Sequence, residues 1–505
     1  MVPMEAMETK MAEAHISRRH LGSCSRAWAV SWARATSGGG LVFLITWMLF
    51  LFLWSSPLLI IEYGTGRYSK KAVLGSFRKF LGDNHMWCGA WVTMVTFCIS
   101  CFYSVVLGWC FYYFIYYIGH SLPTTEEQAR RTFQDYAEGV KTIEKVSLVL
   151  VPVLLLVVMF NFVWSLTREF GDKGIEFLFT PHWKSFLEPR VWVDAISQNA
   201  FDTGAGMGIM IPYSAYMTRK NGIVKYGHLV PAVNNLVSLL CGITIFSTVF
   251  STLMLSRPTY TQADIVNIMK DSGPASTGLT FIWMPVLFET VGDFGRVLAI
   301  MFFLSLSFAG VTSLMSNFEL ATKTLEDFGL PRRFGMPLTI LITFLVGLPS
   351  ALDIDILTNQ DFVWGFALVI NGGMLWYMVL RFGVRKFRQK VVNEVIVPIE
   401  AIAIVAWWAI DLITNDSGDG ENWYAFGRET LVMTLTQWFG LLLLVILVNV
   451  IYIIIRDRKQ EKVSYYGKET DPLILPSSGN ASSRDLDHSL TVSRDLTGSL
   501  KELKL

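Results

Sequence analysis

The sequence has little charge for its length. Only 16% of its 505 residues are Asp, Glu, Lys or Arg, whereas soluble domains contain roughly 25%. Hydrophobic residues make up 52% of the chain, and the mean hydropathy is +0.44. This balance excludes a soluble enzyme and predicts an integral membrane protein whose main partner is the lipid bilayer.

Catalytic motifs and clustered charge are absent as well. The seven histidines form no H-x-x-x-H pair and no G-x-S-x-G motif occurs, so the sequence gives no support for a membrane-embedded enzyme. The net charge of +1 gives no reason to expect a nucleic-acid partner. The first 20 residues are polar and lack the apolar core of a secretory signal peptide.

Long apolar runs dominate the rest of the chain. A helix needs roughly 20 such residues to cross a bilayer. Ten candidate spans lie near residues 41–63, 88–118, 146–166, 195–217, 229–255, 293–322, 337–352, 361–380, 395–413 and 431–455. The polar composition at either end predicts an N-terminal segment over 1–37, a membrane domain over 38–455 and a disordered tail over 456–505.

Lys and Arg cluster in five short stretches, which the positive-inside rule places in the cytoplasm together with the C-terminus. The stretches are 67–79, 219–225, 323–333, 381–390 and the residues after 455. Two spans separate most successive stretches, but three lie between the first and the second. Because an odd number is inconsistent, either one basic stretch lies on the other side or a span is missing. We favour a missing span in the polar region 119–145, which is too charged to hold a helix in lipid.

One apolar run is interrupted by Asn199–Gly208, which reads NAFDTGAGMG. Three glycines and Asp202 are costly in the middle of a span unless they line a cavity. The pattern therefore predicts an unwound helix whose free carbonyls, together with Asp202, coordinate a cation. The alternative is a closely packed glycine face with a paired aspartate.

Three further polar features leave a similar choice open. Asn234 and Asn235 offer oxygen ligands for sodium or hydrogen-bond partners between helices. The segment Ala309–Ser313, with Asn317 a turn further on, offers cation ligands or hydroxyls that bond to their own helix. Glu62, near the inner end of the first span, either caps a broken helix or lies at the membrane interface.

In their order, these motifs resemble those of the sodium-coupled neurotransmitter and amino-acid symporters. The resemblance covers about residues 38–455 and rests on GGGLVFLITW, SSPLLIIEYGTGR, CFYSVVLGW, VWVDAISQNAFDTGAGMGIMIPY, AVNNLVSLLCGI, FAGVTSLMSNFE and NQDFVWGFAL. It implies a helical bundle with two inverted five-helix repeats and broken helices. It also implies Na+-coupled symport of an amino acid or related small carboxylate-bearing solute by alternating access, a plasma-membrane location and no organic cofactor.

The resemblance also assigns roles to individual residues. It places Tyr103 at the substrate carboxylate and the other substrate contacts at Phe201, Gly204, Met207, Ser313 and Asn317. It places the ligands of one sodium ion at Ala309, Thr312 and Ser313, and those of the other at Asp202 and Asn234. It makes Asp361 the outer gate acid, Asp327 the inner gate acid and Glu62 a structural support.

Two positions differ from the family in a way that concerns chloride. Many members have a serine or threonine that touches chloride at the position of Asp202, and a chloride-binding tyrosine near Trp47. A fixed carboxylate supplies the negative charge that a cation site needs in a low dielectric. The resemblance therefore implies transport that does not depend on chloride.

Two parts of the family pattern have no match. The Gly-Asn…Trp-Arg-Phe-Pro signature of the first helix, which supplies sodium ligands and the arginine of the outer gate, is absent from residues 21–37. The fourth helix is absent as well, because Glu138 runs directly into Gly139 at the place where the charge count lacks a span. The chain thus holds about 10 of 12 spans. The alternative function is that of a non-transporting truncated isoform or a regulatory membrane protein of the same fold.

Overall fold

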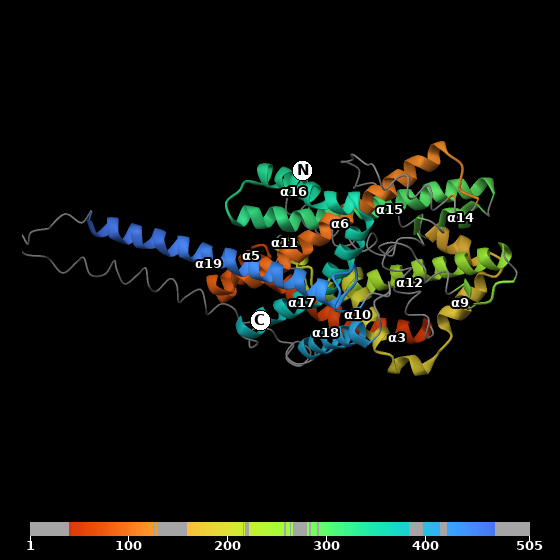
Figure 1. Cartoon of the computed structure of the whole chain (residues 1–505), viewed down its shortest axis with the longest axis horizontal. Coiled ribbons are helices and arrows are strands. Elements are labelled where there is room, and N and C mark those ends of the chain that lie inside the picture. The colour runs from red at the N-terminus through yellow and green to blue at the C-terminus, as the bar shows by residue number, and fades with distance from the viewer. Residues whose placement is uncertain are drawn as a thin grey trace, which may run out of the picture. The chain divides into compact units, whose positions relative to one another are not determined.

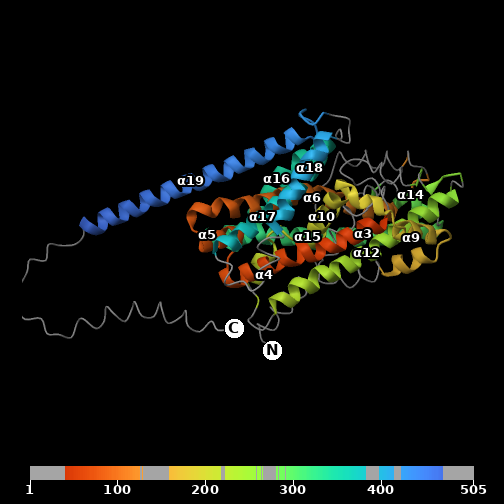
Figure 2. The ribbon, with the colours of Figure 1, turned by 90° about the horizontal axis from the view of Figure 1, so that it is seen from below.

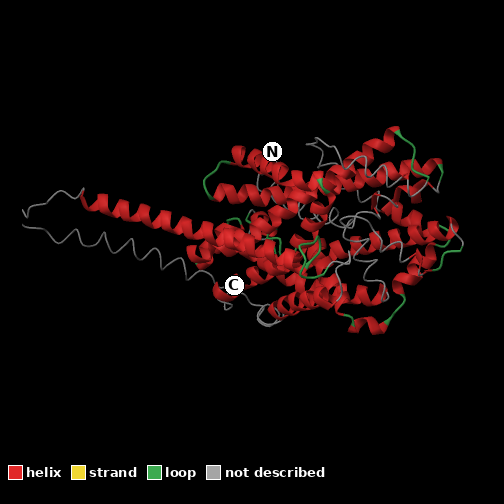
Figure 3. Ribbon diagram, viewed as in Figure 1, coloured by secondary structure: helices red, strands yellow, loops and turns green. Residues whose placement is uncertain are grey.

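The computed structural model describes residues 40–124, 128, 159–215, 217, 222–256, 259–262, 264–265, 280–281, 284–289, 292–382, 397–414 and 422–469. The chain divides into two compact units, Met1–Val450 and Ile451–Leu505. Every regular element within the described ranges is a helix (Figure 3), which confirms the all-α fold class.

The order of the helices along the chain can be followed in Figure 1. The elements are α3 (Gly40–Phe50), η2 (Leu51–Ser55), α4 (Ser56–Ser69), α5 (Val73–Leu81), η3 (Asp83–His85), α6 (Met86–Gly119), α9 (Gly171–Phe179), η4 (Trp183–Leu187), α10 (Pro189–Thr203), α11 (Met210–Ser214), α12 (Ile223–Ser256), α14 (Met284–Glu289), α15 (Asp293–Asp327), α16 (Arg332–Leu352), α17 (Ile354–Phe382), α18 (Val397–Thr414) and α19 (Leu431–Glu469). The first three form one membrane-length helix, in which the π-helical segment η2 widens a turn without ending the helical path.

Seven helices of the described chain are long and apolar enough to cross a membrane. They are Gly40–Ser69, Asp83–Gly119, Ile223–Leu255, Phe294–Asp327, Arg332–Leu352, Ile354–Phe382 and Leu431–Arg458, and each contains or overlaps a span predicted from the sequence. The other three predicted spans have different outcomes. The span at 195–217 is a broken helix, the span at 395–413 corresponds to the shorter apolar helix Ile402–Thr414, and most of 146–166 lies outside the described residues.

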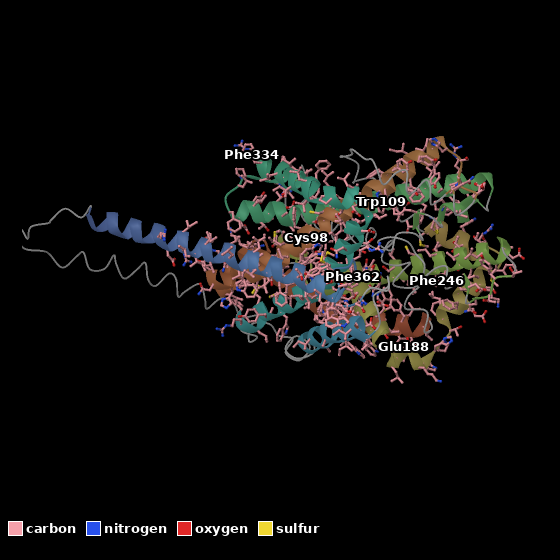
Figure 4. All side chains as sticks on the ribbon, in the orientation of Figure 1. Cys98, Trp109, Glu188, Phe246, Phe334 and Phe362 are labelled. Carbon is pink, nitrogen blue, oxygen red and sulfur yellow. The ribbon has the colours of Figure 1, made fainter. Side chains whose placement is uncertain are left out.

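The interior of the first unit is rich in aromatic side chains where α6 packs along α15. Tyr113 of α6 is fully buried, and its ring centroid lies 5.0 Å from that of Phe303 on α15. In contrast, α16 exposes apolar side chains such as Phe334, which is 57% exposed (Figure 4), and Leu341. An apolar face of this kind fits contact with lipid, whereas the α6–α15 interface forms the packed core.

Residues in or beside four of the five basic stretches meet at one end of the first unit. The Nζ atom of Lys71 lies 3.4 Å from Asp327 Oδ1, which joins the first stretch to the end of α15. The neighbouring Lys70 donates a 2.6 Å hydrogen bond to the carbonyl of Ala215, just after α11. The ring of Phe382, at the end of α17, packs against α5. These stretches therefore share one side, as the charge pattern predicts, and the assignment of that side to the cytoplasm stays a prediction.

The second unit contains the C-terminal part of α19. This helix ends at Glu469, so it continues past Arg456, near which the sequence predicts a disordered tail to begin. Lys, Arg, Gln and Glu are good helix formers, and for that reason a loss of hydropathy does not by itself end a helix. The boundary at 456 marks a change of composition and not the end of α19. Residues 470–505 of the predicted tail and the N-terminal segment 1–37 lie outside the described residues.

Candidate functional site

The predicted unwound helix is present in the structure. Helix α10 ends at Thr203, helix α11 begins at Met210, and the residues between them are not helical. The three glycines of this loop have positive φ angles, +66° at Gly204, +94° at Gly206 and +73° at Gly208. L side chains rarely adopt such angles, so the glycines permit the break and their frequency in the sequence predicts it correctly.

Glu62 of α4 binds the backbone of this loop. Its Oε1 atom accepts hydrogen bonds from the amides of Gly206 at 2.9 Å and Gly208 at 3.2 Å. Its Oε2 atom accepts a third, at 3.0 Å, from the amide of Met210 at the start of α11. The side chain of Glu62 is fully buried, and its carboxylate takes the place of the helical carbonyls that the break removes.

A second polar cluster fixes α10 to its neighbours. The Oδ1 atom of Asn199 lies 3.3 Å from Asn235 Nδ2 on α12 and 3.4 Å from the hydroxyl of Ser55 in η2. The Nδ2 atom of Asn199 donates to the carbonyl of Trp47 in α3. All four side chains are at most 1% exposed. Asn235 therefore acts as an interhelical hydrogen-bond partner, which is one of the two roles that its type allows.

Asp202 and Asn234 lie next to this cluster in the chain. Asp202 is 1% exposed and follows Asn199 by three residues, so it lies about one turn further along α10. Asn234 precedes Asn235, is fully buried, and its Oδ1 atom accepts no hydrogen bond from any described residue. A buried amide oxygen without a donor is costly, and a bound cation removes that cost. Carboxylate and amide oxygens fit sodium, which prefers hard oxygen ligands.

The predicted ligands on α15 bond to their own helix. Thr312 Oγ1 donates to the Ala309 carbonyl at 2.8 Å, and Ser313 Oγ donates to the same carbonyl at 3.2 Å. One turn further on, Ser316 lies 3.2 Å from the hydroxyl of Tyr213 on α11. The segment Ala309–Ser313 thus has the within-helix bonding that the sequence leaves open as an alternative. It lies on α15, which contacts α11, the second half of the broken helix.

The predicted substrate residues lie on α10, in the loop that follows it, on α6 and on α15. The half-buried ring of Phe201 packs on Gly365 of α17, where a Cβ atom would lie 2.7 Å from it. Gly204 and Met207 belong to the loop, and Met207 is 8% exposed. Tyr103 is half-buried on α6, which also contacts α15 with the predicted residues Ser313 and Asn317.

The two predicted gate acids lie at different places. Asp327, at the end of α15, accepts a 2.7 Å hydrogen bond from the amide of Ala72 in addition to its contact with Lys71. Asp361 lies half-buried near the start of α17, a few residues after Asp355, whose carboxylate pairs with Arg428 at 2.6 Å. Burial lowers the pKa of Lys70, the residue before Lys71, and the charge of Arg67 lowers it further.

Sequence reasoning did not identify Ser55, Thr96 or Gln198 as site residues. Ser55 and Thr96 bond to α10 and to the loop, but a lone hydroxyl in an apolar helix usually bonds to its own helix, so the sequence gives no signal. Gln198 is 1% exposed, and neither polar atom of its amide is hydrogen-bonded within the described part of the chain. Its position four residues before Asp202, on the same face of α10, was a usable signal.

A multi-pass helical membrane protein with a discontinuous helix has the architecture of a secondary transporter. The sequence model of the sodium:neurotransmitter symporter family matches residues 24–136 and 133–466, and the chain belongs to this family. The two matched segments overlap at residues 133–136, just before Glu138 and Gly139, where the sequence analysis expects a helix to be missing. Family membership confirms the resemblance and identifies the chain as a sodium-dependent membrane transporter by descent.

Individual relatives agree with this assignment. A sodium-dependent transporter of Methanocaldococcus jannaschii is 26% identical over 420 residues, which cover 75% of this chain and 82% of that protein. The sodium-dependent transporter YhdH of Bacillus subtilis is 28% identical over 358 residues, 66% of this chain and 75% of that protein. The crystal structure of MhsT in complex with L-phenylalanine has a similar fold, with a TM-score of 0.65, 22% identity, and coverage of 79% of this chain and 97% of that chain.

Proposed function

We propose that the protein is a sodium-coupled symporter of an amino acid or a related small carboxylate-bearing solute, and that it works by alternating access without chloride. The observation that carries the proposal is the position of Asp202. Its carboxylate is 1% exposed, in the last turn of a helix that ends at an unwound loop. A buried carboxylate within a membrane span is energetically costly, and such groups are rare unless they have a function.

A sodium ion is the cation that best fits this position. Burying a carboxylate is unfavourable unless a positive charge or several donors accompany it. The amide oxygen of Asn234 adds a second hard ligand, and the carbonyls of an unwound helix add others. Because Asp202 already carries a fixed negative charge, a chloride ion is not required to balance the sodium ion.

The proposed substrate class rests on the types of the predicted pocket residues and on one solved structure of similar fold. Tyr103 offers a hydroxyl for a carboxylate, and Asn317 offers a polar wall. Phe201 and Met207 offer apolar surface, and Gly204 between them carries no side chain. MhsT, which has a similar fold, was crystallised with L-phenylalanine, so we use that amino acid as the first probe.

The orientation follows from the basic end of the first unit. Lys70, Lys71 and Asp327 lie together there, and the positive-inside rule places this end in the cytoplasm. The C-terminus follows on the same side by the count of spans, and the plasma membrane is the expected location.

The test is uptake by the full-length chain in liposomes. We expect L-phenylalanine or another amino acid of a 20-member panel to accumulate under an inward sodium gradient, but not under a potassium gradient. Replacement of chloride by gluconate should leave the initial rate unchanged. No uptake of any amino acid by a correctly folded preparation would contradict the proposal. That result would favour the alternative, a non-transporting membrane protein of the same fold.

A further inference from the structure

Two different helices hold the loop of the broken helix. From one side, Glu62 of α4 accepts hydrogen bonds from the backbone amides of three residues. From another side, the hydroxyl of Thr96 on α6 donates a 2.8 Å hydrogen bond to the carbonyl of Met207. Thr96 is fully buried, so this hydrogen bond lies away from solvent.

Thr96 differs from the neighbouring hydroxyl residues of α6. Thr93 donates to the carbonyl of Gly89, and Ser100 donates to the carbonyl of Thr96, so both bond to their own helix at 2.8 Å. Thr96 reaches a residue that is 111 positions away in the chain. It finds an acceptor because the loop is not helical and its carbonyls lack the partners that a continuous helix provides.

The same face of α6 also fits the loop sterically. A Cβ atom on Gly208 would lie 3.1 Å from Val92 Cγ1 and 2.7 Å from Val73 Cγ2. Val92 precedes Thr96 by one turn, and Tyr103 follows Thr96 by seven residues, which is two turns along the same face. The face of α6 that bears Tyr103 therefore continues directly into the surface that contacts the loop.

From this arrangement we infer that Thr96 is a positioning residue. It fixes the distance between the two sides of the proposed substrate pocket, Tyr103 on α6 and the loop residues Gly204 and Met207. The effect on a substrate pocket rests on the proposed function, but the attachment of the loop to α6 is independent of transport. The carboxylate of Glu62 accepts three hydrogen bonds from the loop, whereas the uncharged hydroxyl of Thr96 donates one to it. The loop therefore stays bound to α4 when the α6 contact is lost.

The test uses three variants of the full-length chain. Thr96→Val has nearly the same shape and removes the donor, Thr96→Ser keeps the hydroxyl, and Thr93→Val makes the same change three residues away at a bond within α6. The first measurement is hydrogen–deuterium exchange of peptides that cover residues 204–210, which needs no substrate. The second is the KM and the maximal rate of sodium-driven L-phenylalanine uptake.

We expect Thr96→Val to speed exchange of the loop amides about tenfold and to raise KM about tenfold, with little change in the maximal rate, because a buried carbonyl loses its donor. Thr96→Ser should restore both values, and Thr93→Val should leave both near wild type. The inference is overturned if loop exchange in Thr96→Val equals that of the wild type, or if Thr93→Val has the same effect. It is also overturned if exchange increases while KM stays unchanged. Absence of uptake by the wild type would refute the proposed function instead, and the exchange result would still decide whether Thr96 holds the loop.

Discussion

The Oε1 atom of Glu62 lies 2.9 Å from the backbone nitrogen of Gly206, across 144 positions of the sequence. The bond joins a continuous helix, Gly40–Ser69, to the interruption of another. A fully buried carboxylate here offsets the unpaired amides at the start of α11, as acidic groups do at other helix N-termini. Figure 2 shows α4 and α12 running beside each other. The break in the helix therefore receives three of its hydrogen bonds from α4.

Removal of this charge should destabilise the folded protein. We expect Glu62→Gln to lower the free energy of unfolding by about 2–3 kcal/mol, because the amide group accepts fewer hydrogen bonds and places its own donors against backbone donors. Thermal unfolding of the purified chain in detergent measures the change. Glu176→Gln, which removes an ion pair with Lys173 in which both side chains are about half-exposed or more, is the control and should cost much less. Equal losses for the two variants would contradict a special role for Glu62.

The backbone conformation of the loop predicts that an alanine substitution destabilises the protein more at one glycine than at another. Gly206 has a φ of +94°, and a Cβ atom there would lie 3.0 Å from the carbonyl oxygen of Leu368. Gly204 has a φ of +66°, and the nearest atom to its Cβ is Met207 Sδ at 3.9 Å. We expect Gly206→Ala to cost at least about 1 kcal/mol more than Gly204→Ala, because it adds crowding to backbone strain. The melting temperatures of both variants decide the question, and the reverse order would show that the loop relaxes more easily than its contacts indicate.

The contacts of Asp327 predict that two substitutions will have unequal effects on local hydrogen exchange. Asp327 is 8% exposed and binds both Lys71 and the amide of Ala72, whereas Lys71 is 49% exposed. Asp327→Asn should therefore increase the hydrogen exchange of residues 70–76 more than Lys71→Ala does, since the lysine contributes only a solvent-screened ion pair. Equal exchange in the two variants would show that the ion pair, and not the bond to Ala72, holds this segment.

The proposed chloride-independent transport predicts the effect of a substitution at Asp202. Asp202→Asn keeps the size of the side chain and removes its charge. We expect the variant to take up substrate with a sodium affinity lowered roughly tenfold or more, and to regain rate when chloride is added. Initial rates in chloride and gluconate media test this. If sodium and chloride dependence are the same in the variant and the wild type, Asp202 does not balance the charge of the ion.

Much of the fold follows from the sequence, since apolar runs of membrane length and a glycine-rich break are local signals. Asp202 and Glu62 were recognisable because a charge inside an apolar run is rare. The hydrogen-bond partners around these residues could not be recognised from the sequence. The bond from Thr96 to Met207 and the cluster of Ser55 with Asn199 join segments more than 100 residues apart, and only the folded chain brings them together. Hydropathy also misplaced the end of α19, because good helix formers extend it to Glu469.

The most direct test of the account is equilibrium binding of radioactive sodium to the purified full-length chain in a chloride-free buffer. The account predicts saturable binding that unlabelled sodium displaces and potassium does not. It also predicts binding that weakens at least about tenfold in Asp202→Asn. Absence of saturable sodium binding, or equal binding by the wild type and the variant, would contradict the claim that this buried carboxylate belongs to a sodium site.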